Sequence, residues 1–221
     1  MALRSPSAPY VLPFVLFLVL VAVMSFVAVT PRLDQIIRIV LVGGTLLLVS
    51  RGVLDLHVSR WAGSVILGVA VFVLWIGPDL LWAGYRELPI FRNGVIGLHV
   101  SSLAEAGRSD PVAIALRFAR AALLVPIVEE LFWRGWLPRW IVDHDFGKVP
   151  LGSYTRAAFW ITVALFAVEH GIYWDVGLLA GIAYNWWMRA TKSLGDCVLA
   201  HAVTNGCLGL YVLLAGRWEY W

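Results

Sequence analysis

The chain has 221 residues, of which 61% are hydrophobic and 14% are charged. A water-soluble fold of this length cannot hide so much apolar surface, whereas a bilayer accepts it. The formal net charge of +3 is modest and its arginines are scattered between apolar runs, which gives no case for nucleic acid as a partner. We therefore expect an integral membrane protein with membrane lipid around it.

Apolar runs near the length of a membrane span predict an all-α, polytopic transmembrane bundle of seven to eight helices. The expected ranges are 10–29, 35–50, 61–77, 112–137, 156–171, 176–190 and 196–215. The first run is as long as a full span and no small-x-small cleavage site follows it, so we expect a retained helix. In the second run, Gly43 and Gly44 form a small-residue patch that would let another helix approach closely.

Two polar stretches, 78–110 and 143–155, are predicted to be loops, the first with room for an interfacial helix. They divide one membrane domain, 1–221, into a front part at 1–110 and a back part at 111–215. Cys197 and Cys207 lie about 15 Å apart along one predicted helix, too far for a disulfide. The distribution of Arg and Lys leans towards a cytoplasmic N-terminus.

Polar side chains that lie inside membrane spans are functional candidates, because burying them in lipid is costly. Three apolar runs of the back part carry such side chains, and each run contains a pair of residues four positions apart. The runs are PIVEELFWRGW with Glu129, Glu130 and Arg134, FAVEHG with His170 four residues after Phe166, and AHAVTN with His201 and Asn205.

Helical geometry separates the roles of the two glutamates. Glu130 and Arg134 are four residues apart and share a face, so the carboxylate can pair with the guanidinium. Glu129 points about a quarter of the circumference away, lacks that ion pair and is surrounded by apolar side chains. Such surroundings favour uptake of a proton, which suits a general base.

His201 and Asn205 also share one helix face, where both can donate hydrogen bonds to a developing oxyanion. His170 stands alone on its helix and must find partners on other helices. If Arg120 marks one membrane edge, Glu129 lies about 14 Å further in, and both histidines reach a similar depth. We therefore predict that five side chains converge on one cavity, namely Glu129, Glu130, His170, His201 and Asn205.

The motifs EExxxR, FxxxH and HxxxN, in this order on successive hydrophobic helices, resemble those of the CAAX-protease and bacteriocin-processing family, also called CPBP or Abi. The resemblance covers 111–214. The segment VLWIGPDLLWAGYR in the front half is similar to the CAAX-protease-related proteins found beside bacterial exosortase systems. Together these resemblances imply an intramembrane protease, a hydrolase of the inner membrane of a prokaryotic cell.

The resemblance also implies roles for single residues. Glu129, held with His170, would activate the water that attacks the scissile carbonyl, and His201 with Asn205 would stabilise the tetrahedral oxyanion. Glu130 and Arg134 match the supporting pair of the family. The expected substrate is a membrane-associated or lipid-modified protein. We expect no cofactor, because FAVEHG does not supply the HExxH zinc motif.

Two alternatives use the same residues. In the first, Glu130, His170 and His201 hold a zinc ion. In the second, the chain is a non-catalytic membrane scaffold or immunity protein whose polar cluster only organises helices, although a scaffold would not need Glu129.

Polar and aromatic residues outside the three motifs receive simpler interpretations. Arg117 and Arg120 are expected to snorkel to the membrane surface, and Trp218 and Trp221 to anchor the chain at the interface.

Overall fold

The structure is a computed structural model that describes residues 5–91 and 105–221, and it is helical throughout these ranges, with no strand. The expected all-α bundle is thereby confirmed. The front half contributes α1 (Ala8–Met24), α2 (Pro31–Thr45, extended by a wider π turn over Leu46–Ser50) and α3 (Trp61–Leu81). The back half contributes α4 (Glu105–Arg108), α5 (Pro111–Ala119), α6 (Val125–Trp133), α7 (Leu137–Val142), α8 (Arg156–Glu169), α9 (Trp174–Thr191) and α10 (Leu194–Ala215).

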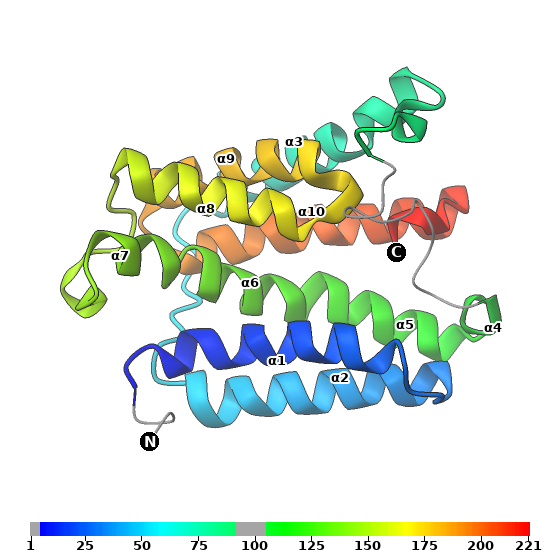
Figure 1. Cartoon of the computed structure of the whole chain (residues 1–221), viewed down its shortest axis with the longest axis horizontal. Coiled ribbons are helices and arrows are strands. Elements are labelled where there is room, and N and C mark those ends of the chain that lie inside the picture. Colours follow the sequence, from blue (N-terminus) through cyan, green and yellow to red (C-terminus); the bar gives the residue numbers. More distant parts are fainter. Residues whose placement is uncertain (1–4, 92–104) are drawn as a thin grey trace.

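The long helices run roughly along one direction and pack side by side (Figure 1). The hairpin of α1 and α2 forms one side of the bundle, where α1 packs on α6 and α2 on α5. Helices α3, α8 and α9 form the other side. Helix α10 packs on α3, on α9 and on α6, so it lies between the two sides, and its His201 also meets the ring of Phe166 on α8.

Each expected helix is present, with boundaries shifted by a few residues. The first ends at Met24 instead of 29, and α3 continues through Pro78 to Leu81. The fourth is interrupted after Trp133, and α7 then follows as a separate short helix. The predicted loop at 78–110 contains short helical turns at Tyr85–Glu87 and at Glu105–Arg108 (α4), while its residues 92–104 lie outside the described residues.

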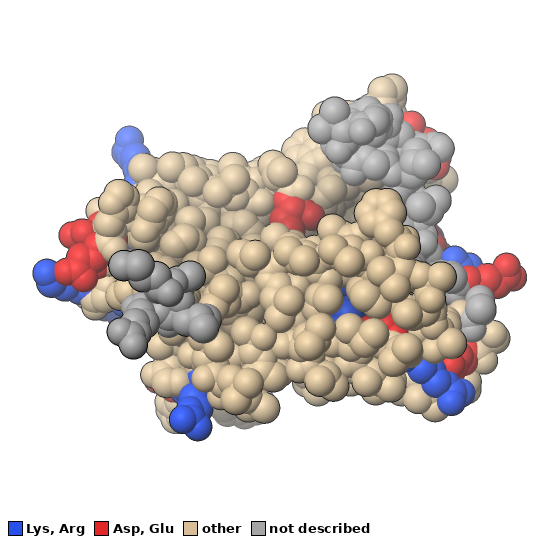
Figure 2. Space-filling view, turned by 60° about the horizontal axis from the view of Figure 1, so that its bottom comes forward, with Lys and Arg blue, Asp and Glu red and all other residues tan. Residues whose placement is uncertain are grey.

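Four helical segments are long and apolar enough to cross a membrane, namely Pro31–Ser50, Trp61–Leu81, Pro111–Val142 and Leu194–Ala215. Large apolar side chains point outward, for example Leu48 at 82% exposure and Leu214 at 85%. Figure 2 shows most Lys, Arg, Asp and Glu side chains of this face gathered towards the two ends of the long axis, with a largely uncharged surface between. These features are those of an integral membrane bundle.

Local sequence signals explain where two helices of the back half begin. Asp110 caps α5 by accepting hydrogen bonds from the backbone N–H groups of Val112 and Ala113, at 3.0 and 3.2 Å, and Pro111 fills the first helical position. A hydrogen bond from Arg32 lowers the pKa of the Asp110 carboxyl. Ser193 caps α10 in the same way, through the N–H of Asp196.

The closest approach of two helices occurs at Gly68, where α3 crosses α10. A Cβ added to Gly68 would lie 2.4 Å from the carbonyl oxygen of Ala200 and 2.7 Å from Cβ of Val203. The carbonyl oxygen of Gly68 accepts a hydrogen bond from Thr204 Oγ1 at 2.8 Å. The expectation for Gly43 and Gly44 is wrong, since an added Cβ at either would meet no described atom within 4 Å.

Replacing Gly68 with Ala should therefore destabilise the bundle by about 1–3 kcal/mol, because the backbone of α10 cannot yield to the methyl group. Thermal melting of the detergent-solubilised protein measures this loss. Gly43→Ala is the matched control, and it should melt within a degree or two of the parent. Equal melting of both variants would contradict the close contact of α3 with α10.

Candidate active site

The helix that carries the EExxxR motif widens before it reaches the motif. Arg120–Leu124 forms a π turn between α5 and α6, in which the N–H of Val125 bonds to the carbonyl of Arg120, five residues earlier. In this register the donor for the carbonyl of Ala121 would be residue 126, which is a proline without an N–H. Pro126 thus leaves the carbonyl of Ala121 in need of another donor.

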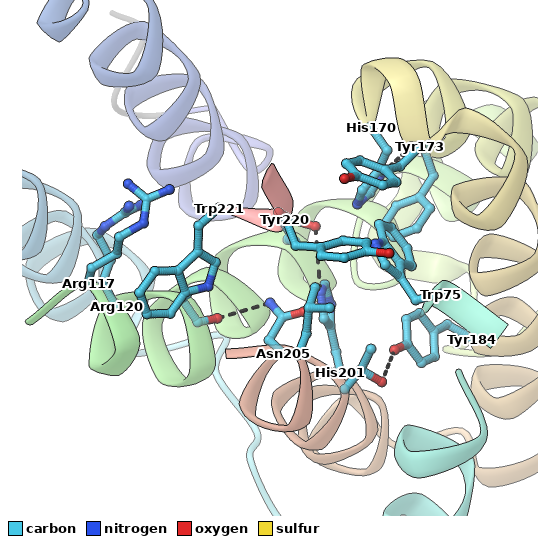
Figure 3. Close-up of a pocket in the computed structure, with 15 residues that line it drawn as sticks. Trp75, Arg117, Arg120, His170, Tyr173, Tyr184, His201, Asn205, Tyr220 and Trp221 are labelled. Atoms are coloured by element: carbon cyan, nitrogen blue, oxygen red, sulfur yellow. Dashed lines mark hydrogen bonds and ion pairs between the residues drawn. The ribbon is translucent and has the colours of Figure 1, made fainter. Parts of the chain in front are cut away.

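Asn205 of α10 supplies that donor. Its Nδ2 donates a hydrogen bond of 2.9 Å to the carbonyl oxygen of Ala121 (Figure 3). An amide nitrogen carries two hydrogens, so one N–H of Asn205 remains for a ligand. The proline and the asparagine, 79 positions apart in the printed sequence, together fix the orientation of this amide.

Glu130, Arg134 and His201 form a buried cluster behind the cavity. Arg134 Nη1 donates to Glu130 Oε1 at 3.0 Å, and the carboxylate is fully buried. The same Oε1 accepts from Nδ1 of His201 at 2.8 Å, since a paired carboxylate can only accept. The expected pairing of Glu130 with Arg134 is present, and His201 joins it from another helix.

The guanidinium of Arg134 is also held by α8 and α9. Its Nε donates to Oδ1 of Asn185 at 3.2 Å, and its Cζ lies 4.4 Å from the ring centroid of Phe166. The FxxxH phenylalanine therefore contacts the EExxxR arginine directly. This cluster links α6, α8, α9 and α10.

Glu129 lies apart from this cluster, as its position on the helix predicts. Its side chain is nearly buried, and its Oε2 lies 4.0 Å from Nε2 of His201, beyond hydrogen-bonding distance. This oxygen has no hydrogen-bond partner among the described residues. Glu129 therefore offers a carboxylate oxygen to whatever enters the cavity.

His170 ends α8 with its ring turned towards the same cavity. Its Nδ1 lies 2.7 Å from the carbonyl oxygen of Phe166, so Nδ1 carries the hydrogen and Nε2 is an acceptor in the neutral ring. Trp75 of α3 packs edge-on against the imidazole at 5.1 Å. On the α9 side, Gly177 leaves room for His170, because a Cβ added to Gly177 would lie only 3.1 Å from Cβ of His170.

A cavity of about 270 Å³ brings together Glu129, His170, His201 and Asn205. Figure 3 shows His201 and Asn205 on one side of it and His170 on the other. Glu130 and Arg134 do not line this cavity but support it from behind through His201. Four of the five side chains predicted to converge on one cavity line it, whereas Glu130 lies behind the wall because its carboxylate is held by Arg134 and His201; the catalytic role of each residue remains a prediction.

Several residues of the cavity wall do not belong to the three motifs. Trp75 comes from α3, Tyr184 from α9, and Tyr220 and Trp221 from the segment after α10. Arg117, Arg120 and Trp221, which the sequence predicts to lie at the membrane surface, line the cavity. The positive φ of Gly216, +67°, turns the chain back after α10 and brings Trp221 to this wall.

The zinc alternative does not fit this arrangement. Glu130 Oε1 already accepts from Arg134 and His201, and Glu130 does not line the cavity with His170. Among the residues that the structure describes, no three His, Cys, Asp or Glu side chains are placed to hold a metal ion. Cys197 and Cys207 are both free, as expected.

Comparison with known proteins gives one match. Residues 111–207 match a family model described as Type II CAAX prenyl endopeptidase Rce1-like. The matched segment contains all six predicted site residues, whereas Trp75, Tyr220 and Trp221 lie outside it. No curated protein and no solved structure matches the chain.

Replacing Arg134 with Met should reduce folded yield and stability before it affects chemistry, because it leaves the buried Glu130 carboxylate without its cation. Breaking such a pair costs about 3–5 kcal/mol. Melting of the solubilised variant measures the loss. The double variant Glu130→Gln with Arg134→Met removes both charges and should recover part of the lost stability. If the single variant melts like the parent, the cluster does not hold the bundle together.

Proposed function

Because residues 111–207 match the family model of the Type II CAAX prenyl endopeptidase Rce1-like proteins, we propose that the chain is an intramembrane endopeptidase of this kind that uses Glu129 to activate water. Its substrate is a peptide bond of a membrane-associated or lipid-modified protein. The observation that carries this proposal is the meeting of Glu129, His170, His201 and Asn205 in one cavity inside an apolar bundle. Within the CAAX-protease family, the exosortase-associated subgroup and the inner membrane of a prokaryote with a cytoplasmic N-terminus stay predictions.

Glu129 and His170 activate the water molecule. The unpartnered Oε2 of Glu129 accepts a proton from a water in the cavity, while Nε2 of His170 accepts the other hydrogen and orients the oxygen. Because the Glu129 side chain is buried in a cavity whose wall includes Phe166 and Trp75, the carboxylate is poorly solvated and takes the proton readily. The hydroxide so formed attacks the carbonyl carbon of the scissile bond.

Asn205 and His201 stabilise the oxyanion of the tetrahedral intermediate by donating hydrogen bonds to it. The second N–H of Asn205 is available, and its direction is fixed by the bond to Ala121. His201 donates from Nε2 only when its ring carries both protons, and the Glu130 carboxylate at Nδ1 balances that charge. Protonated Glu129 then gives its proton to the leaving amine, which restores the carboxylate and completes the hydrolysis.

Glu129→Gln should lower the rate of peptide cleavage by about 10²- to 10⁴-fold without lowering the melting temperature, because it keeps the shape and removes the base. The assay is cleavage of a lipidated peptide by the solubilised protein. Glu169→Gln is a matched control, since Glu169 is a neighbouring carboxylate that accepts from Trp133 Nε1 at 3.0 Å and does not line the cavity. An active Glu129→Gln variant would remove this mechanism, and a scaffold would show no cleavage in the parent chain.

Prolonged chelation should leave cleavage unchanged, because the described residues do not form a three-ligand set in the cavity. The measurement compares cleavage before and after dialysis against a chelator, together with the metal content of the same sample. Loss of activity together with stoichiometric zinc, and recovery on adding zinc back, would instead support the zinc alternative.

A further inference from the structure

The segment VLWIGPDLLWAGYR, residues 73–86, carries polar side chains that the proposed mechanism does not use. Asp79 lies in the last turn of α3, and Tyr85 and Arg86 lie in the short helical turn that follows. Arg86 is 2% exposed, so its charge is buried. Because a buried guanidinium needs partners from the protein, those partners show which parts of the fold this segment holds together.

Arg86 joins the end of α3 to the start of α9. Its Nε donates to Oδ1 of Asp79 at 3.1 Å, and its Nη1 donates to Oδ1 of Asp175 at 2.5 Å. The hydroxyl of Tyr85 donates to the other oxygen of Asp175 at 3.0 Å. The hydroxyl of Tyr220 donates to the other oxygen of Asp79. All four carboxylate oxygens therefore accept hydrogen bonds, which holds the two aspartates and the guanidinium in one arrangement.

The same guanidinium holds the turn that follows His170. Nη1 of Arg86 also donates to the backbone carbonyl oxygen of Ile172 at 2.9 Å, and Cζ of Arg86 lies 4.7 Å from the ring centroid of Tyr173. Gly171 opens this turn with a φ of +54°, a conformation that glycine adopts without strain. The N–H of Tyr173 bonds to the carbonyl of His170 at 3.0 Å. Arg86 thus fixes the backbone two residues after His170.

Aromatic rings carry this anchor into the wall of the cavity. Tyr173 and Tyr220 both line the cavity, and their rings stack with centroids 5.3 Å apart. Trp75 belongs to the same segment as Arg86, and it also lines the cavity and packs against His170. Figure 3 shows His170 and Tyr173 together on one side of this space. The segment therefore reaches His170 twice, through the ring of Trp75 and through the backbone bond of Arg86.

His170 depends on support of this kind because it stands at the end of α8, where the helix gives way to the turn. Its Nδ1 bonds to the carbonyl of Phe166, so the position of Nε2 follows the backbone at the end of the helix. A displacement of about 1 Å that starts at a distant residue can lower the rate of a reaction about 10²-fold. The anchor of the turn is thus able to control the proposed chemistry from outside the cavity.

We propose that Arg86, together with Asp79 and Asp175, positions His170 so that its Nε2 faces the water beside Glu129. This inference rests on the proposed function, which it deepens by assigning a role to residues outside the matched segment 111–207. Arg86 is a positioning residue, because it acts through the turn after α8 and is not among the residues that line the cavity.

Cleavage kinetics of Arg86→Met test this role, measured at a temperature where every variant is folded. Turnover, kcat, should fall about 10- to 100-fold while KM stays within about twofold, because the variant disturbs the placement of His170 and removes no contact to the substrate. Arg38→Met is the matched control. Arg38 forms a partly buried ion pair with Asp34 at 2.8 Å on α2 and does not line the cavity, so this variant should lose stability but keep the parental kcat.

A second measurement follows His170 without using proteolysis. Modification by diethyl pyrocarbonate, located by mass spectrometry, gives the rate at His170 relative to the exposed His144 of the same chain. Arg86→Met should raise this ratio several-fold, because the released turn exposes the imidazole, whereas Arg38→Met should leave it at the parental value. A parent chain that cleaves nothing would remove the proposed proteolysis, while these ratios would still decide whether Arg86 holds His170.

Two milder variants separate positioning from stability if Arg86→Met folds poorly. Arg86→Lys keeps the charge but cannot span Asp79, Asp175 and the carbonyl of Ile172 together, so it should regain melting temperature without regaining kcat. Asp175→Asn should lower kcat about 3- to 10-fold. A kcat that simply follows the melting temperature across all variants, or an unchanged modification ratio at His170 in every variant of the cluster, would overturn the proposal.

Discussion

The bundle depends on holding one guanidinium inside an apolar interior, where its Nη1 and Nε have partners and its Nη2 has none among the described residues. Arg134 reaches Glu130 on its own helix, Asn185 on α9 and the ring of Phe166 on α8, and Glu130 passes the interaction on to His201 of α10. Lipid offers no competing hydrogen bonds, so these partners must come from the protein. The need to satisfy one buried charge thus sets the relative positions of four helices, and these helices carry every predicted site residue.

The parts of the site that follow from helical geometry could be predicted from the sequence. The spacing of four residues places Glu130 beside Arg134 and turns Glu129 away, because both facts depend only on the helix. The choice of partner for His201 could not be predicted in this way. Its Nδ1 bonds to Glu130, whereas Glu129 Oε2 lies 4.0 Å from its Nε2. Which glutamate bonds to His201 depends on how α6 and α10 pack against each other, and the spacing of residues along one helix does not specify that packing.

Small residues show the same limit. A pair such as Gly43–Gly44 is a recognisable pattern, yet no helix of the described residues packs closely on it, whereas the single Gly68 lets α3 touch the backbone of α10. A glycine permits a close approach but does not specify a partner. The turn at Gly216 likewise carries Trp221 back to the cavity, and no local pattern in an aromatic segment distinguishes a cavity wall from an interface anchor. Pro126 is a stronger signal. Because it lacks an N–H, the carbonyl of Ala121 in the preceding turn must find its donor elsewhere in the structure.

The cavity that holds the predicted site residues has a wall drawn from two parts of the chain. The polar side chains come from 111–207, whereas Trp75, Tyr220 and Trp221 come from outside this segment and shape the space in front of the polar groups. Chemistry and selectivity can therefore change independently during evolution. Relatives that share the polar motifs can acquire different client proteins by altering a front helix or a tail, and a chimera that exchanges only those outer segments would exchange clients as well.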